Sequence, residues 1–210
     1  MKHNKRLTAL SFAAVILMLA VRFNQTQSPP ESITGAWQLE QGSIKQVLVF
    51  QDGYFSHTVF DVPNKKFVST YGGVYKIEGN ALELLLEFDT RSTEEIGNEK
   101  SFTHAISANK LTTDLNRTKE GWTRIDDGKD NLAGIWRITG RMADGKISEM
   151  PRRDRKTLKL LSATRFQWMA INPATKEFFG TGGGTYTFIN GKYTEYIEFF
   201  SRDSSRVGSS

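Results

Sequence analysis

Side chains able to catalyse a reaction or to bind a metal are scarce in this chain. It has no cysteine, and only His57 and His104 follow the first 27 residues. Thiolate sites and three-histidine metal sites are therefore excluded. A repeated segment, described below, places Trp168 where its first copy has His57, and tryptophan cannot replace a metal ligand. We expect His57 to line a core or a pocket, and we predict no metal and no cofactor.

Two glutamates recur in the repeat, Glu87 and Glu198, and each is followed four residues later by an arginine. Four residues of extended strand span roughly 13 Å, so the carboxylate and the guanidinium of one strand cannot meet. The glycine-rich stretch 180–184 lacks the lysine and the following helix of a phosphate-binding loop. No catalytic residue is predicted, and the chain is expected to be a binding protein rather than an enzyme.

The positive charge is concentrated near the N-terminus. The net charge is +5, but beyond the first 27 residues Lys and Arg exceed Asp and Glu by only one. A nucleic-acid partner, which would need a basic face on the folded domain, is therefore not expected. The densest basic run of the remainder, 151–156, is either a solvated loop or a contact for an anionic polymer, lipid headgroups or an acidic partner.

Residues 1–28 have the layout of an export leader. A short basic start precedes an apolar run, 7–21, and a polar exit that contains Pro29-Pro30. The run predicts a hydrophobic leader helix, although it is shorter than the ~20 residues that cross a bilayer comfortably. No clear cleavage site follows, so a cleaved signal peptide and an uncleaved membrane anchor both remain open. Either one predicts export to the periplasm, the outer surface or the medium, with membrane contact only through this segment.

An internal repeat organises the rest of the chain. Residues 55–97 align with 166–208 without a gap, and 11 of the 43 aligned positions are identical. Upstream, Gly35-Ala36-Trp37 matches Gly134-Ile135-Trp136. We predict two units, 33–126 and 132–210.

The second unit ends before the strand-like segments that complete the first. It is therefore either a fragment or a unit that borrows strands from elsewhere. An exposed sheet edge pairs readily with another chain, so self-association through this unfinished sheet is a further expectation.

Alternation of apolar and polar residues dominates both units and predicts an all-β fold. The pattern places Phe67, Tyr71 and Tyr75 on one face of a strand, and Leu82, Leu84, Leu86 and Phe88 on one face of the next. Short strands separated by turns such as Asn190-Gly191 indicate an antiparallel meander. If the meander closes into a barrel, no strand is left with an unpaired edge.

The Gly-x-Trp motif at the head of both units resembles the opening motif of lipocalins and the wider calycin group. Residues 157–208 also resemble lipocalin-like domains of bacterial secreted proteins of uncharacterised function. The resemblance implies a duplicated lipocalin-type barrel whose second copy is incomplete. It also implies that Trp37 closes one end of the first barrel beneath Arg124 from the last strand, a cation–π contact. Trp136 would hold the equivalent place in the second copy, which has no matching arginine.

The sequence thus predicts an exported, non-catalytic protein that holds a small, largely apolar ligand in a barrel mouth. The alternative is an envelope protein-interaction module with a filled barrel and no small-molecule ligand. The residues expected to line the ligand site are Phe55, His57, Tyr71 and Tyr75 in the first copy, and Phe166, Trp168 and Tyr186 in the second.

Overall fold

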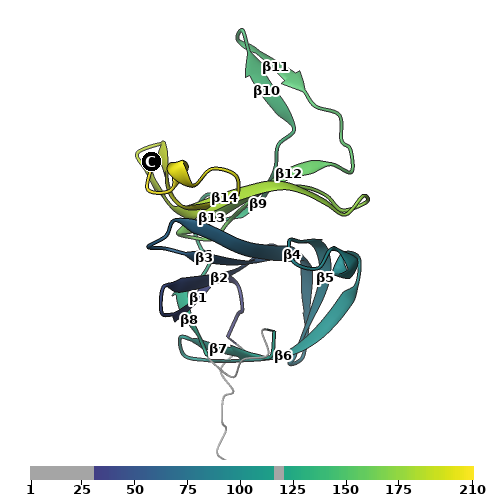
Figure 1. Ribbon diagram of the computed structural model, residues 1–210, viewed down its shortest axis with the longest axis vertical. Helices are drawn as coiled ribbons and strands as arrows, with labels where there is room; N and C mark the ends of the chain where they lie inside the picture. The colour runs from purple at the N-terminus through teal and green to yellow at the C-terminus, as the bar shows by residue number, and fades with distance from the viewer. Residues whose placement is uncertain (1–30, 116–120) are drawn as a thin grey trace, which may run out of the picture. The chain divides into compact units, whose positions relative to one another are not determined.

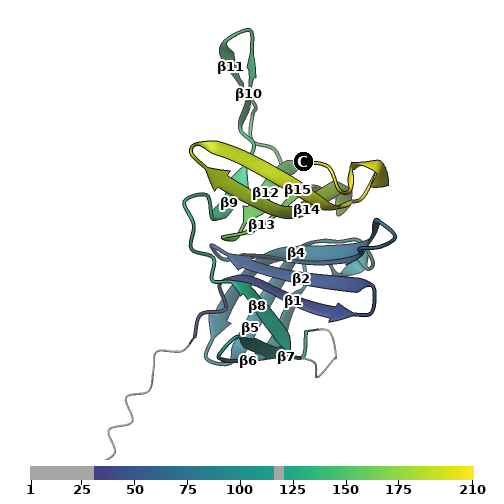
Figure 2. The same ribbon diagram turned by 90° about the vertical axis from the view of Figure 1, so that its left-hand side faces the viewer.

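The computed structural model describes residues 31–115 and 121–210 (Figures 1 and 2). The leader or anchor predicted for 1–28 lies outside these residues. Within them, regular structure is all-β apart from two 3-10 turns, Thr93–Glu95 and Ser204–Arg206, which confirms the predicted fold class. None of the described residues belongs to a helix long and apolar enough to span a membrane.

The first eight strands form a closed antiparallel barrel in sequence order, and β8 pairs back onto β1. This arrangement confirms the predicted antiparallel meander barrel. Eight strands leave an interior that side chains can fill, or that holds one small ligand. The strands are β1 Gly35–Gln41, β2 Ile44–Gln51, β3 Tyr54–Asp61, β4 Lys66–Glu78, β5 Ala81–Asp89, β6 Glu99–Ser107, β7 Lys110–Thr113 and β8 Trp122–Asp126.

A β-bulge corrects one expectation about the faces of β5. The pairing of β4 with β5 shifts register between Gly72 and Gly73, so Leu86 pairs with Gly73 while Phe88 pairs with Gly72. Leu86 packs in the barrel interior, whereas Phe88 packs outside it. The prediction that Phe88 shares a face with the three leucines of this strand was wrong, because the inserted residue, Glu87, reverses the alternation after it.

The remaining strands form an open five-stranded sheet, ordered β15-β14-β13-β12-β9, and a separate two-stranded ribbon, β10-β11. In Figure 1 the sheet lies across β2–β5 of the barrel, and the ribbon projects beyond the sheet. The strands are β9 Gly134–Arg137, β10 Gly140–Ala143, β11 Lys146–Glu149, β12 Lys156–Leu161, β13 Arg165–Asn172, β14 Glu177–Ile189 and β15 Lys192–Phe200.

Three strands of the sheet match three strands of the barrel in length and spacing. β13, β14 and β15 begin 111 residues after β3, β4 and β5 and have the same lengths of 8, 13 and 9 residues. The bulge between Gly72 and Gly73 has a counterpart between Gly183 and Gly184. At both places a close backbone approach requires glycine, since a Cβ on Gly73 would lie 2.0 Å from the Leu85 carbonyl oxygen.

An apolar layer joins the sheet to the outer wall of the barrel. We call it the intersheet core. Its contacts come in pairs in which equivalent residues of the two units change places. Phe67 packs against Phe199 with ring centroids 6.3 Å apart, and Phe178 packs against Phe88 at 6.2 Å. The two glutamates of the repeat lie at its border, where Glu87 pairs with Lys156 at 2.7 Å and Glu198 with Lys45 at 3.9 Å. Such reciprocal contacts are the geometry of a two-fold interface. The buried members of the intersheet core are Ala36, Val47, Val49, Tyr54, Phe60, Phe88, Leu158, Leu160, Met169, Ile171 and Phe199.

A buried polar network sits within this layer. Thr58 donates its hydroxyl proton to Gln167 Oε1 at 2.9 Å, and Gln167 Nε2 donates to the hydroxyls of Thr70 at 3.1 Å and Thr181 at 3.0 Å. The hydroxyls of Thr70 and Thr181 in turn donate hydrogen bonds to the backbone carbonyls of residues 57 and 168. Every proton of the network therefore has an acceptor, as burial away from water requires.

Candidate functional site

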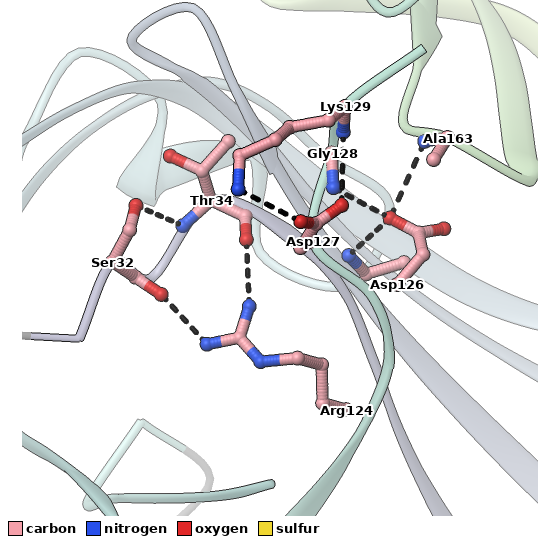
Figure 3. Close-up of polar contacts among 9 residues, drawn as sticks. Ser32, Thr34, Arg124, Asp126, Asp127, Gly128, Lys129 and Ala163 are labelled. Carbon is pink, nitrogen blue, oxygen red and sulfur yellow. Dashed lines mark hydrogen bonds and ion pairs between the residues drawn. The ribbon is translucent and has the colours of Figure 1, made fainter. Parts of the chain in front are cut away.

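One end of the barrel is built around Trp37. Its ring is fully buried, and its Nε1 donates to the Ile33 carbonyl at 2.8 Å. The Arg124 guanidinium carbon lies 3.9 Å from the ring centroid, so the two residues paired by the lipocalin resemblance are in contact. Arg124 also donates to the carbonyls of Thr34 at 2.9 Å and Ser32 at 2.7 Å (Figure 3). One side chain thus covers the tryptophan and holds the chain that enters β1.

Asp126, at the end of β8, ties this end of the barrel to the second sheet. Its carboxylate accepts from the backbone amides of Ala36 in β1, Gly128 in the linker and Ala163 in the β12–β13 turn (Figure 3). It also accepts from the Ser162 hydroxyl at 2.8 Å. These contacts have a structural role, because they join β1, β8 and the β12–β13 turn.

The four ligand-site residues predicted in the first copy come together on the inner wall of the barrel. Phe55 and Tyr71 have centroids 6.1 Å apart, and His57 and Tyr71 are 4.8 Å apart. Tyr75 packs edge-on against Phe50 at 5.1 Å. Phe55 and His57 are buried, while Tyr71 and Tyr75 are partly buried. These rings pack together in the core of the barrel.

His57 is held neutral inside this wall. Burial, with a smaller contribution from the nearby charge of Arg91, lowers the pKa of His57 from 6.5 to about 3. Its Nε2 lies 3.1 Å from Gln46 Oε1, and because an amide oxygen only accepts, Nε2 carries the proton. Nδ1 is then a buried acceptor, and it has no partner among the described residues.

Trp122 supplies the complementary group. Its ring, fully buried, lies 5.6 Å from that of His57, and its Nε1–H is a buried donor with no partner among the described residues. A buried donor and a buried acceptor left unpaired each cost roughly 1–3 kcal/mol, so a water or a polar ligand group that bonded to either of them would stabilise the folded protein.

A small opening borders this wall at Tyr71, and neither His57 nor Trp122 is among its lining residues. It has a volume of about 170 Å³. Apolar residues form most of its lining, with Asp89 and Lys100 beside them. Burial and the negative charge of Asp89 raise the pKa of Tyr71, so its hydroxyl stays protonated and can donate. The lining residues are Tyr71, Leu84, Leu86, Asp89, Lys100, Phe102 and Leu115.

The three ligand-site residues predicted in the second copy lie on the other face of the five-stranded sheet, apart from the first four. Phe166 and Tyr186 are buried there, and the Tyr186 hydroxyl donates to the Ser162 carbonyl at 2.7 Å. Trp168 packs against Phe200 at 5.4 Å. A Cβ on Gly182 would lie 2.7 Å from both rings, so the space opened by this glycine is occupied by Trp168 and Phe200.

Trp136 repeats half of the arrangement at Trp37. Its Nε1 donates to the Leu132 carbonyl at 2.9 Å, as Trp37 does to Ile33. Among the described residues, no arginine covers the Trp136 ring. Trp136 lies on β9, an edge strand of the open sheet, and is 53% exposed. In the described residues it closes no barrel.

Sequence reasoning missed Trp122 and the apolar rim of the opening. A signal for Trp122 was present, because it stands two residues before Arg124 on one strand, and alternate residues of a strand face the same side. Once Arg124 is placed over Trp37 inside the barrel, Trp122 must also point inward. Phe102 and Leu115 had no such signal, since their position depends on barrel closure.

The chain gives no match in comparisons with protein-family models, with curated proteins or with solved structures.

Proposed function

We propose that this protein is an exported, non-catalytic binding protein of the lipocalin-like type, and that its first barrel holds a small, largely apolar ligand carrying one polar group. We further propose that the two units arose by duplication. The matched strands, the matched bulges and the exchanged contacts of the intersheet core support this origin.

The observation that carries the ligand proposal is the pair of buried, unpartnered polar atoms in an aromatic wall. His57 Nδ1 can accept and Trp122 Nε1 can donate, and a hydroxyl group of a ligand can satisfy both. The neighbouring opening of about 170 Å³ is below the ~300–1,000 Å³ of sites for drug-sized molecules. It is comparable with the ~150 Å³ cavity that admits benzene, so the ligand is about the size of a single ring.

Native mass spectrometry of the full chain recovered from an envelope fraction tests this proposal. We expect a monomer with an added mass of the order of a hundred daltons that denaturation releases, as the size of a benzene-binding cavity implies. Trp122→Phe keeps an aromatic side chain, although a smaller one, and removes the donor, so ligand affinity should fall roughly fivefold, the contribution of one hydrogen bond.

Trp136→Phe is the matched control, because it changes an exposed tryptophan remote from this wall and should leave affinity unchanged. A chain with the same mass under native and denaturing conditions would overturn the proposal, since water alone would then fill the site. The mass of the recovered chain also distinguishes a cleaved leader from a retained anchor.

The second candidate function is a protein-interaction module without a small-molecule ligand. The exposed Trp136, beside Ile138 at 51% exposure and on the free edge strand β9, favours it. Exposed apolar side chains along an unpaired strand edge are a surface for another chain. Concentration-dependent assembly in sedimentation velocity, lost in Trp136→Ser and retained in Trp122→Phe, would favour this candidate over the ligand site.

A further inference from the structure

A basic cavity lies between the β10–β11 ribbon and the sheet, away from the proposed ligand site. It has a volume of about 400 Å³, and no acidic side chain is among its lining residues. Between residues 137 and 156, Lys and Arg exceed Asp and Glu by four, whereas the excess over 31–210 is one. This segment therefore carries a larger excess of positive charge than residues 31–210 do as a whole. The basic lining residues are Arg137, Arg141, Arg152, Arg153, Arg155 and Lys156.

Three of these six basic side chains already contact other groups of the protein around the cavity. Lys156 pairs with Glu87 at 2.7 Å, Arg155 lies 4.1 Å over the ring of Phe179, and Arg137 donates to the Arg153 carbonyl at 2.6 Å. The side chains of the other three, Arg141, Arg152 and Arg153, are exposed and form no ion pair with any described residue. Like charges placed together in this way create a field that attracts anions.

The ribbon beside the cavity adds an apolar surface. Met142 and Ile147 are directly paired across its two strands, so both point to the same face. They are 71% and 70% exposed, the highest values among the large apolar side chains of the described residues. Arg141, next to Met142, points to the opposite face, since neighbours on a strand alternate. Gly140 and Glu149, two residues further along the paired strands, lie on the same face as Met142 and Ile147, and nothing in the described residues covers the two apolar side chains.

From this combination we infer that the ribbon and the cavity form a docking site for an anionic lipid bilayer. The apolar pair contacts the acyl–headgroup boundary, and the free arginines bind lipid phosphates. A soluble polyanion would explain the arginines but not the exposed Met142 and Ile147, which is why a lipid surface is the better occupant. Asp144, in the ribbon turn, remains in the hydrated headgroup layer when the apolar face lies flat on the membrane.

A fluorescent label on the ribbon tests the site in the full chain. Because the sequence has no cysteine, Met142→Cys offers a single position for an environment-sensitive fluorophore. We expect a blue shift with vesicles of mixed phosphatidylcholine and phosphatidylglycerol, and none with phosphatidylcholine alone. Val62→Cys, in the exposed β3–β4 turn, is the matched label position and should show no shift with either vesicle. Both labelled chains carry the same N-terminal segment, so membrane binding through that segment cannot produce the difference.

Charge variants then measure the contribution of the arginines. In the Met142→Cys chain, Arg141→Gln, Arg152→Gln and Arg153→Gln together should weaken partition to the anionic vesicles roughly 100-fold, since each basic residue at such a surface is worth about a factor of five. The matched control removes three exposed lysines elsewhere, Lys66, Lys129 and Lys192, and should weaken partition far less.

Three results would overturn the inference: equal shifts with both vesicles, equal loss in the two triple variants, or a label that responds to soluble polyphosphate but not to anionic vesicles.

Discussion

Replacing Gln167 with leucine tests whether the second sheet and the barrel fold as one unit. Gln167 is 3% exposed, and it is the residue through which the sheet makes hydrogen bonds to the barrel residues Thr58 and Thr70 within the intersheet core. Leucine has nearly the same size, so Gln167→Leu removes the amide without opening a large cavity.

The expected loss of stability follows from the hydrogen bonds that the variant loses and the one that it can form again. Three hydrogen bonds disappear, at about 1 kcal/mol each. The Thr58 hydroxyl lies 3.0 Å from Thr70 Oγ1, which loses its donor in the variant, so Thr58 can donate there and recover one bond. We therefore expect Gln167→Leu to lower the free energy of unfolding by about 2 kcal/mol, or Tm by roughly 4–8 °C for a domain of this size.

Urea unfolding followed by far-UV circular dichroism and by tryptophan fluorescence measures both the size of the loss and the cooperativity. Thr58→Val provides the matched partner for a double-mutant cycle, in which we expect a coupling energy of about 1 kcal/mol. The reasoning fails if Gln167→Leu changes stability by less than about 0.5 kcal/mol. It also fails if the two probes show separate transitions and the substitution shifts only one of them.

Three further predictions address the barrel itself. Arg124→Ala should lower the free energy of unfolding by about 2–3 kcal/mol, because it removes the contact with Trp37 and two hydrogen bonds to carbonyls. Arg124→Lys should recover less than half of that loss, and denaturant titration measures both variants. An alanine variant as stable as the unchanged protein would show that the contact does not stabilise the barrel. Gly73→Ala should lower the free energy of unfolding by about 3 kcal/mol or more, because the added Cβ meets the Leu85 carbonyl. Gly121→Ala is the control and should change Tm little, since its Cβ would meet nothing nearer than 3.8 Å. Similar Tm values for the two variants would contradict the close approach at Gly73. His57 binds a proton more readily unfolded than folded, so its contribution to stability is complete above pH 6.5 and is lost as the pH falls towards about 3. Between pH 7 and pH 5 the loss from this residue should be about 2 kcal/mol, and His57→Phe should flatten the measured pH dependence; an unchanged slope would mean that His57 is not buried and neutral.

The sequence alone was sufficient to predict much of the barrel. Alternation and turn residues predicted the all-β meander, and the repeat predicted matching segments whose strands have equal lengths. Trp37 and Arg124 were paired through the Gly-x-Trp motif and are in contact. The meander follows from local patterns, because the period of a strand and the residues of a tight turn are determined within a few positions. The pairing of Trp37 with Arg124 came instead from the resemblance to lipocalins.

The tertiary structure decided what the patterns could not. Phe88 faces outward because β5 carries one extra residue, Glu87, in its pairing with β4, and that residue reverses the alternation after it. The neutral state of His57 and the unpaired Nε1 of Trp122 depend on barrel closure, which brings the side chains of these two residues of β3 and β8 together although they are far apart in the sequence. The intersheet core and the basic cavity arise where separate elements meet. Such properties depend on which surfaces exclude water from one another, and that is established only when the whole chain has packed.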